Sequence, residues 1–279
     1  MTGTERFRRV IKRHHRVHRA VRRARFVVGN VVPPRRVDGI PGRVHFNDFM
    51  FPYGSPAEIA SYAERARNVI ALIEETLEAA KRTFDDVGRW LDFGCGYGRV
   101  IRFLVELVPP ERIVASDVIE QGAEFCHAEF GVARLPSQSE LGSVRLGHFD
   151  FIYAISVITH LNERNSIAFL RLLGESLAPG GIAMFTTHGR WSVEHAGLYG
   201  TEYEDLSEDI EAALQAHGIA YIRYPFTPED YGITWHSKSF IETTIARLHG
   251  GQVIPLLFKP RGLDDHQDVF AFQRVEQSV

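Results

Sequence analysis

From residue 89 onward, short apolar runs alternate with amphipathic stretches along the chain. Buried strands are predicted at 89–93, 112–116, 149–157 and 181–187, where apolar residues follow one another in short continuous runs. Helices are predicted at 98–108, 119–130 and 163–177, where apolar residues recur three or four positions apart. Strands that alternate with long helices form βαβ units, so the pattern predicts an α/β fold with a parallel sheet.

The last part of the chain has a different order of elements. A helix is predicted at 238–248, and it precedes two β-like runs at 253–258 and 269–275. The connection between these two runs is too short for a helical crossover, so we expect them to pair as antiparallel strands. Upstream of this pair, residues 189–236 interrupt the alternation with a mixed stretch that contains a helix at 207–217.

A long helix is also predicted before the first strand, at residues 57–83. Ser55 is the expected N-cap, because its hydroxyl can accept a hydrogen bond from the first turn, and Pro56 suits the first helical position. Tyr53 and Gly54 precede this helix, and we expect them to close over a ligand bound at the sheet edge.

The start of the chain predicts an amphipathic basic helix. Residues 5–28 place apolar side chains three or four positions apart and arginine at most other positions. Three prolines between residues 33 and 41 cannot continue a helix, so they end it. We therefore divide the chain into a basic helix with its linker at 1–40 and a main domain at 41–279, with 189–236 as an insertion in that domain.

The net charge of −3 hides a strong asymmetry along the chain. Residues 1–36 carry twelve Lys and Arg against one acid, whereas the rest carries twenty bases and thirty-four acids. A basic amphipathic helix is typical of a segment that binds an anionic membrane surface, and it also suits nucleic acid. The alternatives are a solvated helix, a helix docked on the acidic body or on an acidic partner, and an organellar transit peptide, although serine is missing from it.

Composition narrows the class of protein. The chain has 279 residues, of which 44% are apolar and 24% charged, as in a globular protein with a sizeable core. No run of eighteen apolar residues is present, so no transmembrane helix is expected. The two cysteines, Cys95 and Cys126, exclude a disulfide scaffold and fit a reducing compartment such as the cytoplasm. No spacing of Cys and His resembles a metal site.

The most informative motif is LDFGCGYGR at residues 91–99, between a predicted strand and a predicted helix. Its three alternating glycines allow a tight turn that brings the backbone close to a ligand. Arg99 stands where a dinucleotide-binding loop has its third glycine. Asp92, two residues before the first glycine, gives no advantage to a pyrophosphate but favours a cationic ligand.

A second acid, Asp117, ends the next predicted strand, nineteen residues after the last glycine of this loop. An acid at that place can accept hydrogen bonds from both hydroxyls of a ribose. The loop, this acid and the apolar strand at 149–157 occur in this order, and together they make a strong signal, whereas any one of them alone would be weak.

These motifs resemble those of the class I S-adenosylmethionine-dependent methyltransferases. LDFGCGYGR is similar to their first motif, Asp117 to their ribose-binding acid, and FDFIYAISVITHL to their fourth-strand motif. The resemblance covers residues 85–188 and, by topology, 237–275. It implies a Rossmann-like seven-stranded sheet with a terminal antiparallel strand pair, S-adenosylmethionine as cofactor, and methyl transfer as the activity.

The resemblance also implies which residues bind the cofactor. Asp92 and the backbone of the glycine loop are expected to receive the methionine part, and Asp117 to bind the ribose. The loop residues concerned are Gly94, Cys95, Gly96 and Gly98. The residues expected around the rest of the cofactor are Val118 and Ile119 beside the adenine and Ile155 and Ser156 near the sulfonium.

A methyl acceptor with a hydroxyl group loses a proton, so a general base would assist its methylation. His160 and His188 follow predicted strands at the edge where ligands collect in open α/β folds, and they are the candidate bases. His236 and His266 are further candidates, and for each of the four an ordinary backbone-bonded histidine is the alternative. Cys95 is expected to be a spacer in the loop rather than a nucleophile.

The segments ITHL, TTHG and HQD around these histidines resemble methyltransferases found with saccharide and glycolipid assembly enzymes. The resemblance implies O-methylation of a hydroxyl on a sugar, a glycolipid or another small molecule, with the insertion at 189–236 as the cover on the acceptor side. Peripheral association with an anionic membrane through residues 5–28 fits such an acceptor.

Other functions are compatible with the same motifs. The chain could be a regulatory protein that binds the cofactor without turnover, or an enzyme that uses a different nucleotide. A nucleic-acid methyltransferase would need a basic face on its catalytic domain, and the acidic body argues against this alternative.

Overall fold

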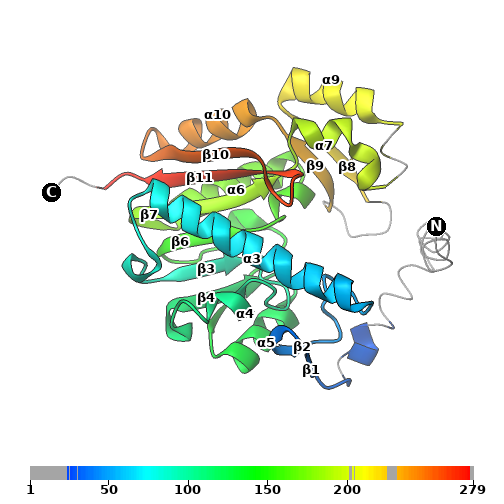
Figure 1. The fold of residues 1–279 in the computed structure, drawn as a ribbon. Coiled ribbons are helices and arrows are strands. Elements are labelled where there is room, and N and C mark those ends of the chain that lie inside the picture. The colour runs from blue at the N-terminus through cyan, green and yellow to red at the C-terminus, as the bar shows by residue number, and fades with distance from the viewer. Residues whose placement is uncertain are drawn as a thin grey trace.

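A seven-stranded sheet forms the centre of the molecule (Figure 1). The computed structural model describes residues 24, 26–29, 31–200, 203, 205–224 and 231–276. The strand order is β10-β11-β7-β6-β3-β4-β5, and two smaller hairpins lie apart from this sheet. The strands of the large sheet are β3 (Trp90–Phe93), β4 (Ile113–Asp117), β5 (Ala133–Pro136), β6 (Phe149–Ala154), β7 (Leu177–Thr187), β10 (Val253–Leu263) and β11 (Gln267–Arg274).

The strands from β3 to β7 run parallel, whereas β11 pairs antiparallel with both β7 and β10. This is a Rossmann-like arrangement, so the predictions of a seven-stranded sheet and of a terminal antiparallel pair are confirmed. Every residue of β3 and most residues of β4, β6 and β7 are buried, because helices cover both faces of the sheet.

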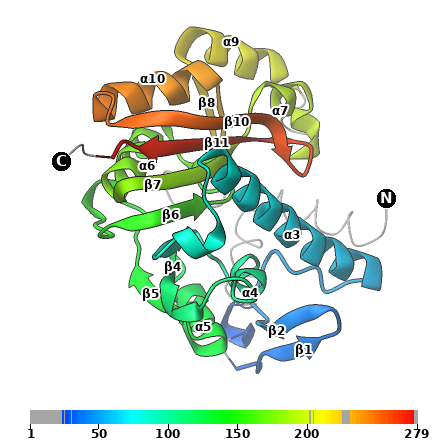
Figure 2. The same cartoon turned by 60° about the vertical axis from the view of Figure 1, so that its left-hand side comes forward.

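Two layers of helices enclose the sheet (Figures 1 and 2). One layer holds α3 (Pro56–Ala79), α4 (Ile101–Leu104) and α5 (Glu120–Phe130), and the other holds α6 (Glu163–Glu175) and α10 (Lys238–His249). Helix α3 begins at a capping box, in which the Ser55 amide donates to Glu58 and the Glu58 amide donates to the Ser55 hydroxyl. The predicted N-cap is therefore confirmed.

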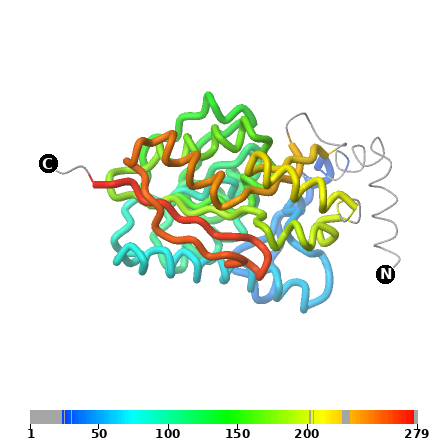
Figure 3. Tube along the Cα trace, turned by 90° about the horizontal axis from the view of Figure 1, so that it is seen from above, coloured from blue at the N-terminus to red at the C-terminus, as the bar shows by residue number. Residues whose placement is uncertain are grey.

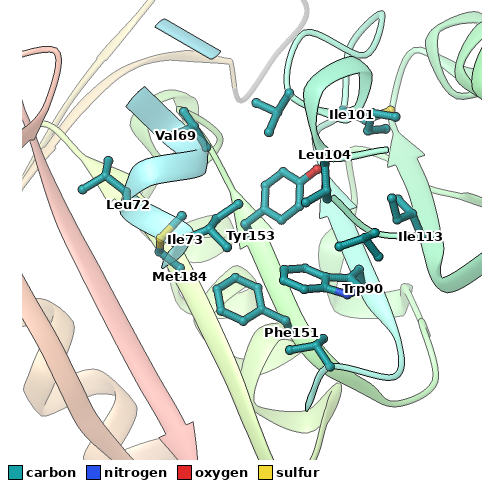
Figure 4. Packing of buried hydrophobic residues seen from close by; sticks show 14 of the residues in the cluster. Val69, Leu72, Ile73, Trp90, Ile101, Leu104, Ile113, Phe151, Tyr153 and Met184 are labelled. Carbon is teal, nitrogen blue, oxygen red and sulfur yellow. The ribbon is translucent and has the colours of Figure 1, made fainter. Parts of the chain in front are cut away.

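The core between α3 and the sheet is built from large aromatic and aliphatic side chains (Figure 4). Trp90 of β3 and Phe151 of β6 lie on neighbouring strands, with their ring centroids 4.9 Å apart. Ile73 of α3 and Met184 of β7 belong to the same buried cluster. This packing fixes β3 and β6, the two strands that carry or precede several of the predicted site residues.

Two predicted elements are shorter than the sequence pattern indicated. Of the helix predicted at 98–108, only α4 is regular, because Gly98 adopts a left-handed φ of +75° and Pro109 follows the last turn. The strand predicted at 149–157 ends before the chain turns at Ser156, where φ is +58°. Single 3₁₀ turns connect other elements at η1 (Phe84–Asp86), η2 (Pro110–Arg112), η3 (Leu141–Ser143), η4 (Ile158–His160) and η5 (Ala196–Leu198).

The hairpin of β1 (Arg35–Val37) and β2 (Ile40–Val44) forms where the sequence predicted only a linker. Its prolines and glycines obscure the alternation of a strand, and its two strands pair across the boundary predicted at residue 40. Arg43 of β2 forms an ion pair of 2.6 Å with Glu129 of α5, which attaches the hairpin to the main domain. Strand β5 was not predicted either, since its side chains are mostly exposed.

Residues 189–236 contribute a small unit beside the sheet. Within its described residues are α7 (Arg190–Glu194), α9 (Ser207–His217), β8 (Ile219–Arg223) and β9 (Gly232–His236), and β8 and β9 pair as an antiparallel hairpin. The helix predicted at 207–217 is therefore confirmed. Trp235 lies in a separate buried cluster of this unit. Figure 3 shows the unit at the same end of the molecule as the β1–β2 hairpin, with β11 running to the opposite end.

Most of the basic helix predicted at 5–28 lies outside the described residues, so its structure and its partner stay predictions. Residues 26–29, which are described, are helical and lead into the linker. Within the described part of the chain, no helix is long and apolar enough to cross a membrane.

Arg102 of α4 is fully buried and joins the glycine loop to β2. Its guanidinium donates to the carbonyl oxygens of Gly98 and Pro41, at 3.1 and 2.8 Å. Further neighbours are the carbonyl oxygens of Tyr97 and Arg43 and the rings of Tyr62 and Phe130. Only a planar group with several donors in fixed directions can serve so many acceptors at once.

We expect Arg102→Lys to lower the free energy of unfolding by about 2–4 kcal/mol, because an ammonium group leaves some of these buried carbonyls unpaired. Urea unfolding followed by circular dichroism measures the change. Arg164→Lys is the matched control, since Arg164 is exposed on α6, and its effect should stay within about 0.5 kcal/mol. A change as small for Arg102→Lys as for the control would contradict the role of Arg102.

Candidate active site

The carboxyl ends of four parallel strands bring predicted site residues to one edge of the sheet. Asp92 lies in β3, Asp117 ends β4, Ser156 follows β6 and His188 follows β7. These residues are far apart in the chain, and only the parallel topology collects them at the edge where open α/β sheets bind ligands.

The loop between β3 and α4 is bent by glycines with left-handed backbone. Gly94 and Gly96 have φ values of +89° and +53°. A Cβ atom at Gly94 would clash with Val157, whereas a Cβ atom at Gly96 would meet no atom within 4 Å. The Gly96 α-carbon therefore faces open space, where a ligand can approach the backbone. The Gly94 amide donates to the Ser116 carbonyl at 2.7 Å and ties the loop to β4.

Asp117 holds the same loop from the neighbouring strand. Its carboxylate accepts hydrogen bonds from the backbone amides of Gly96 at 2.8 Å and Ile119 at 2.7 Å. Burial raises the pKa of Asp117, and these two amides oppose the shift. Each carboxylate oxygen can accept more than one hydrogen bond, so both can also accept from ribose hydroxyls. Val118 follows with a side chain that is 59% exposed and offers an apolar surface for a base.

Asp92 is a buried carboxyl group at the base of the loop, with 3% exposure. Burial raises the pKa of Asp92 to about 8; the Tyr153 hydroxyl opposes the shift, the nearby Asp117 adds to it, and Arg99 opposes it. Much of this carboxyl is therefore protonated at neutral pH. A cationic group bound beside it would favour the carboxylate and lower the pKa again.

These features fit the cofactor that the sequence motifs imply. Gly96 leaves room for a ligand against the loop, and Asp92 offers an anionic group to the ammonium of its amino-acid part. Asp117 offers acceptors to the ribose hydroxyls, and Val118 offers a surface to the base. The structure therefore brings the predicted cofactor residues together, and their contacts with the cofactor stay predictions.

Ser156 joins the end of β6 to two other strands. Its amide donates to the Thr186 hydroxyl at 2.8 Å, and its hydroxyl donates to Gln267 Oε1 at 3.0 Å. Its left-handed backbone is unfavourable for a non-glycine residue, and such conformations concentrate at functional sites. Ile155 beside it packs against the core. Both residues predicted near the sulfonium thus lie at the sheet edge, beside the glycine loop.

Cys95 points into the protein rather than toward a ligand. Its thiol and that of Cys126 lie 3.5 and 3.8 Å from the Gly96 carbonyl oxygen. The Cys126 thiol and burial raise the pKa of Cys95, so the reactive thiolate form is disfavoured. These contacts are those of a spacer that packs the inner side of the loop.

Three of the four candidate histidines are anchored in or on β9. The contacts are His160 Nδ1 to the Gly232 carbonyl at 2.9 Å, His188 Nδ1 to the Thr234 carbonyl at 3.1 Å, and His236 Nε2 to the Ser166 hydroxyl at 3.1 Å. Burial is the main cause that lowers the pKa of all three, to about 3 for His188 and His236. These histidines are therefore neutral at pH 7.

Aromatic side chains of the insertion pack against the imidazole rings of His160 and His188. His160 stacks on Tyr231, with ring centroids 4.9 Å apart. His188 is buried, and its ring centroid lies 4.5 Å from that of Tyr199.

A pocket of about 360 Å³ opens between α3, the insertion and the turn from β10 to β11. Its lining residues are Arg65, Trp191, Leu198, Tyr199, Asp264, Asp265 and His266. Among the candidate histidines, His266 is the one that lines this pocket. The Ser192 hydroxyl donates to the His266 carbonyl at 2.7 Å, and the Tyr199 hydroxyl donates to Ser192 at 2.9 Å, so hydrogen bonds fix this wall.

Strand β11 connects this pocket to the cofactor edge. His266 lines the pocket, and the next residue, Gln267, accepts the hydrogen bond from Ser156. Two consecutive residues at the start of β11 thus link the pocket wall to Ser156, which is predicted to lie near the sulfonium.

Residues 45–53 lie against the other side of the glycine loop. The His45 ring stacks on Tyr97 of the loop, with centroids 4.6 Å apart. Asn47 and Tyr97 both donate to Gln121 Oε1, at 3.0 and 2.7 Å. Tyr53, predicted to close over the ligand, donates to the His45 carbonyl at 2.8 Å and so reaches the loop through His45.

Several pocket residues could not be found from the sequence. Arg65 is one exposed residue among many on α3, and only the fold brings Asp264 within 3.7 Å of it. Gln267 belongs to no motif, and its contact with Ser156 depends on the position of β11 in the sheet. The adjacent acids at 264 and 265 signal a turn, and both have left-handed backbone there, but they do not signal a pocket.

A comparison with protein families agrees with this geometry. Residues 62–248 match the family model described as a methyltransferase domain. No curated protein shows significant sequence similarity to the chain.

Solved structures with a similar fold include the N-terminal domain of EvdMO1, determined in the presence of SAH and D-fucose. It has 15% identity and a TM-score of 0.51, and the match covers 93% of this chain and 97% of that chain. The same domain with SAH bound gives a TM-score of 0.52 at the same identity and coverage. An S-adenosylmethionine-dependent methyltransferase from Clostridium acetobutylicum has 12% identity and a TM-score of 0.49, with 77% and 92% of the two chains covered. At 15% identity, the two matches to the EvdMO1 domain show a shared fold.

We expect protons to be released when the demethylated cofactor product binds at pH 7. The ligand ammonium should convert Asp92, whose pKa is about 8 in the free protein, to its carboxylate form. Up to about one proton should be released per site, and the release should fall as the pH rises above 8, because Asp92 is then already ionised. Titration calorimetry in buffers of different ionisation enthalpy measures this number.

The variant Asp92→Asn should bind without this proton release. Asp85→Asn is the matched control, since Asp85 lies on the separate turn η1, and its proton release should equal that of the wild type. Equal release from wild type and Asp92→Asn would rule out Asp92 as the group that meets the ligand ammonium.

Proposed function

The chain belongs to the methyltransferase domain family and its cofactor is S-adenosylmethionine, and from this premise we propose that it methylates a hydroxyl group of a sugar, a glycolipid or another small molecule. The observation that carries the proposal is the pocket beside His266. This pocket combines an apolar wall, acceptors for hydroxyl groups and a candidate base.

Bound S-adenosylmethionine supplies a methyl group that its sulfonium has already activated. The residues that would hold it are Asp92, the backbone around Gly96, Asp117 and Val118. What the protein must add is the alignment of an acceptor oxygen with that group, and alignment can remove about 7–11 kcal/mol of the barrier.

The lining of the pocket suits a ligand with several hydroxyl groups. Trp191, Leu198 and Tyr199 form an apolar wall against which the C–H groups of a sugar or a lipid can pack. Asp264 and Asp265 can accept hydrogen bonds from hydroxyl groups. The EvdMO1 domain, which shares the fold, was crystallised in the presence of D-fucose, so a sugar acceptor is compatible with this architecture.

Asp264 is fixed in place by helix α3. Asn68 donates to its carboxylate at 3.0 Å, and Arg65 lies 3.7 Å from it. A carboxylate held in this way can orient a ligand hydroxyl with little loss of side-chain freedom on binding.

His266 is the general base in this proposal. Its Nδ1 lies 3.1 Å from the Asp264 carbonyl, which can only accept, so Nδ1 carries the hydrogen and Nε2 is left as the proton acceptor. Nε2 would take the proton of an acceptor hydroxyl, and the imidazolium so formed would carry the positive charge that the sulfonium of the bound cofactor brings to the site.

His188 and His160, the bases predicted from the sequence, have less favourable positions for this role. His188 contacts Tyr199 of the pocket wall but does not line the pocket. Its pKa, lowered to about 3 mainly by burial, makes it a weak proton acceptor. His160 is held between β9 and Tyr231. We assign His188 to the support of the pocket wall and His160 to the support of the β8–β9 hairpin.

Transfer of labelled methyl groups to free hexoses, to a glycolipid extract and to RNA tests the proposed function. We expect incorporation into the sugar or glycolipid fraction. His266→Asn should lower kcat about 10²- to 10⁴-fold, the usual contribution of a general base, while the affinity for the demethylated product stays unchanged.

His217→Asn is the matched control, because His217 is exposed at the end of α9. Incorporation into RNA, or into none of the fractions despite cofactor binding, would refute the proposal. A larger fall in kcat for His188→Asn than for His266→Asn, at equal stability, would assign the base to His188 instead.

A further inference from the structure

Exposed apolar side chains are concentrated in the first described part of the chain. Of the thirteen large hydrophobic side chains that are exposed among the described residues, seven lie between residues 26 and 53. Val31 is the most exposed of those at 26–31, with 79% exposure, and Met50 is the most exposed of those at 49–53, with 57%. The members of this N-terminal apolar face are Phe26, Val27, Val28, Val31, Phe49, Met50 and Tyr53.

The two segments that carry this face lie side by side. The Asn47 side chain donates to the Phe26 carbonyl at 3.2 Å. Asn47 also fills the space where a side chain at Gly29 would stand, so the helical turn at 26–29 packs directly on it. Figure 1 shows this turn, in dark blue, beside β2. The exposed residues of both segments therefore belong to one surface, of the kind that marks an interaction site.

The charge around this face indicates what binds to it. Arg35 and Arg36 are exposed next to it, and the Arg35 guanidinium lies 5.4 Å from the centre of the Tyr53 ring. The sequence up to residue 36 carries twelve Lys and Arg against one acid. A second copy of the chain would bring its own positive charge against this positive charge, which is unfavourable. Nucleic acid would attract the positive charge, but its phosphate backbone would not bury the apolar side chains.

We propose that the N-terminal apolar face docks on a lipid membrane that contains anionic lipids. The apolar side chains would enter the interface between headgroups and acyl chains, and Arg35 and Arg36 beside them would bind the headgroup phosphates. This combination provides the two signals, apolar and electrostatic, that stable peripheral binding needs.

The inner side of the same segment contacts the cofactor loop. His45 stacks on Tyr97, and Asn47 and Tyr97 share the Gln121 acceptor. Met50 is three residues from Asn47, whose side chain contacts both the helical turn at 26–29 and α5. Docking at this face would place the glycine loop directly behind the membrane contact. The inference does not depend on which acceptor the enzyme methylates.

Co-sedimentation of the full chain with vesicles tests the inference. Vesicles of phosphatidylglycerol and phosphatidylcholine should bind the protein, and vesicles of phosphatidylcholine alone should not. Raising the salt from about 0.1 M to about 0.5 M should weaken binding, because screening reduces the electrostatic part. The double variant Val31→Ser/Met50→Ser should bind the anionic vesicles at least tenfold more weakly.

Ile254→Ser is the matched control, because Ile254 is an exposed apolar residue of β10 and lies outside the face. It should bind vesicles as the wild type does, and calorimetry with the demethylated product should show that both variants are folded. Absence of binding to anionic vesicles would overturn the inference. So would binding that the double variant retains in full, or a dimer in size-exclusion chromatography that the double variant dissociates.

Discussion

Two carboxyl groups on neighbouring buried strands set the physical constraint on the site. Asp92 and Asp117 belong to β3 and β4, which pair in parallel, and burial raises the pKa of both. Two acids close together in a poorly solvated place are unfavourable as a pair of anions, so one of them takes up a proton or a cation binds beside it. The glycine loop is bent so that the open side of Gly96 faces this place, which suits a cationic nucleoside.

The surrounding structure fixes the position of Asp92 and Asp117 relative to the pocket proposed for the methyl acceptor. Arg102 fixes the end of the glycine loop to β2, and Ser156 fixes the end of β6 to β11. The hydrogen bond between Ser156 and Gln267 also positions His266, because His266 directly precedes Gln267 in the chain. The cofactor edge and the pocket are therefore parts of one frame, whose rigidity comes from the core around Trp90.

The sequence was informative where structure depends on neighbours in the chain. Buried strands are continuous apolar runs, and the glycine loop with Asp117 is a local motif, so the sheet and the cofactor residues could be predicted. The insertion that carries Trp191 was predicted to cover the acceptor side, but the rest of the pocket could not be predicted, because Arg65 and Asp264 come from distant segments and neither differs from an ordinary surface residue. The choice among the histidines depends on burial, which separates His188 from His266 although both stand near strand ends.

A crystal structure of the protein with the demethylated cofactor product tests the central claim most directly. The account predicts that both ribose hydroxyls lie within hydrogen-bond distance of the Asp117 carboxylate and that the ligand ammonium lies beside Asp92, over the open side of Gly96. A ligand bound with its ribose away from Asp117, or with its amino-acid part outside the glycine loop, would contradict it.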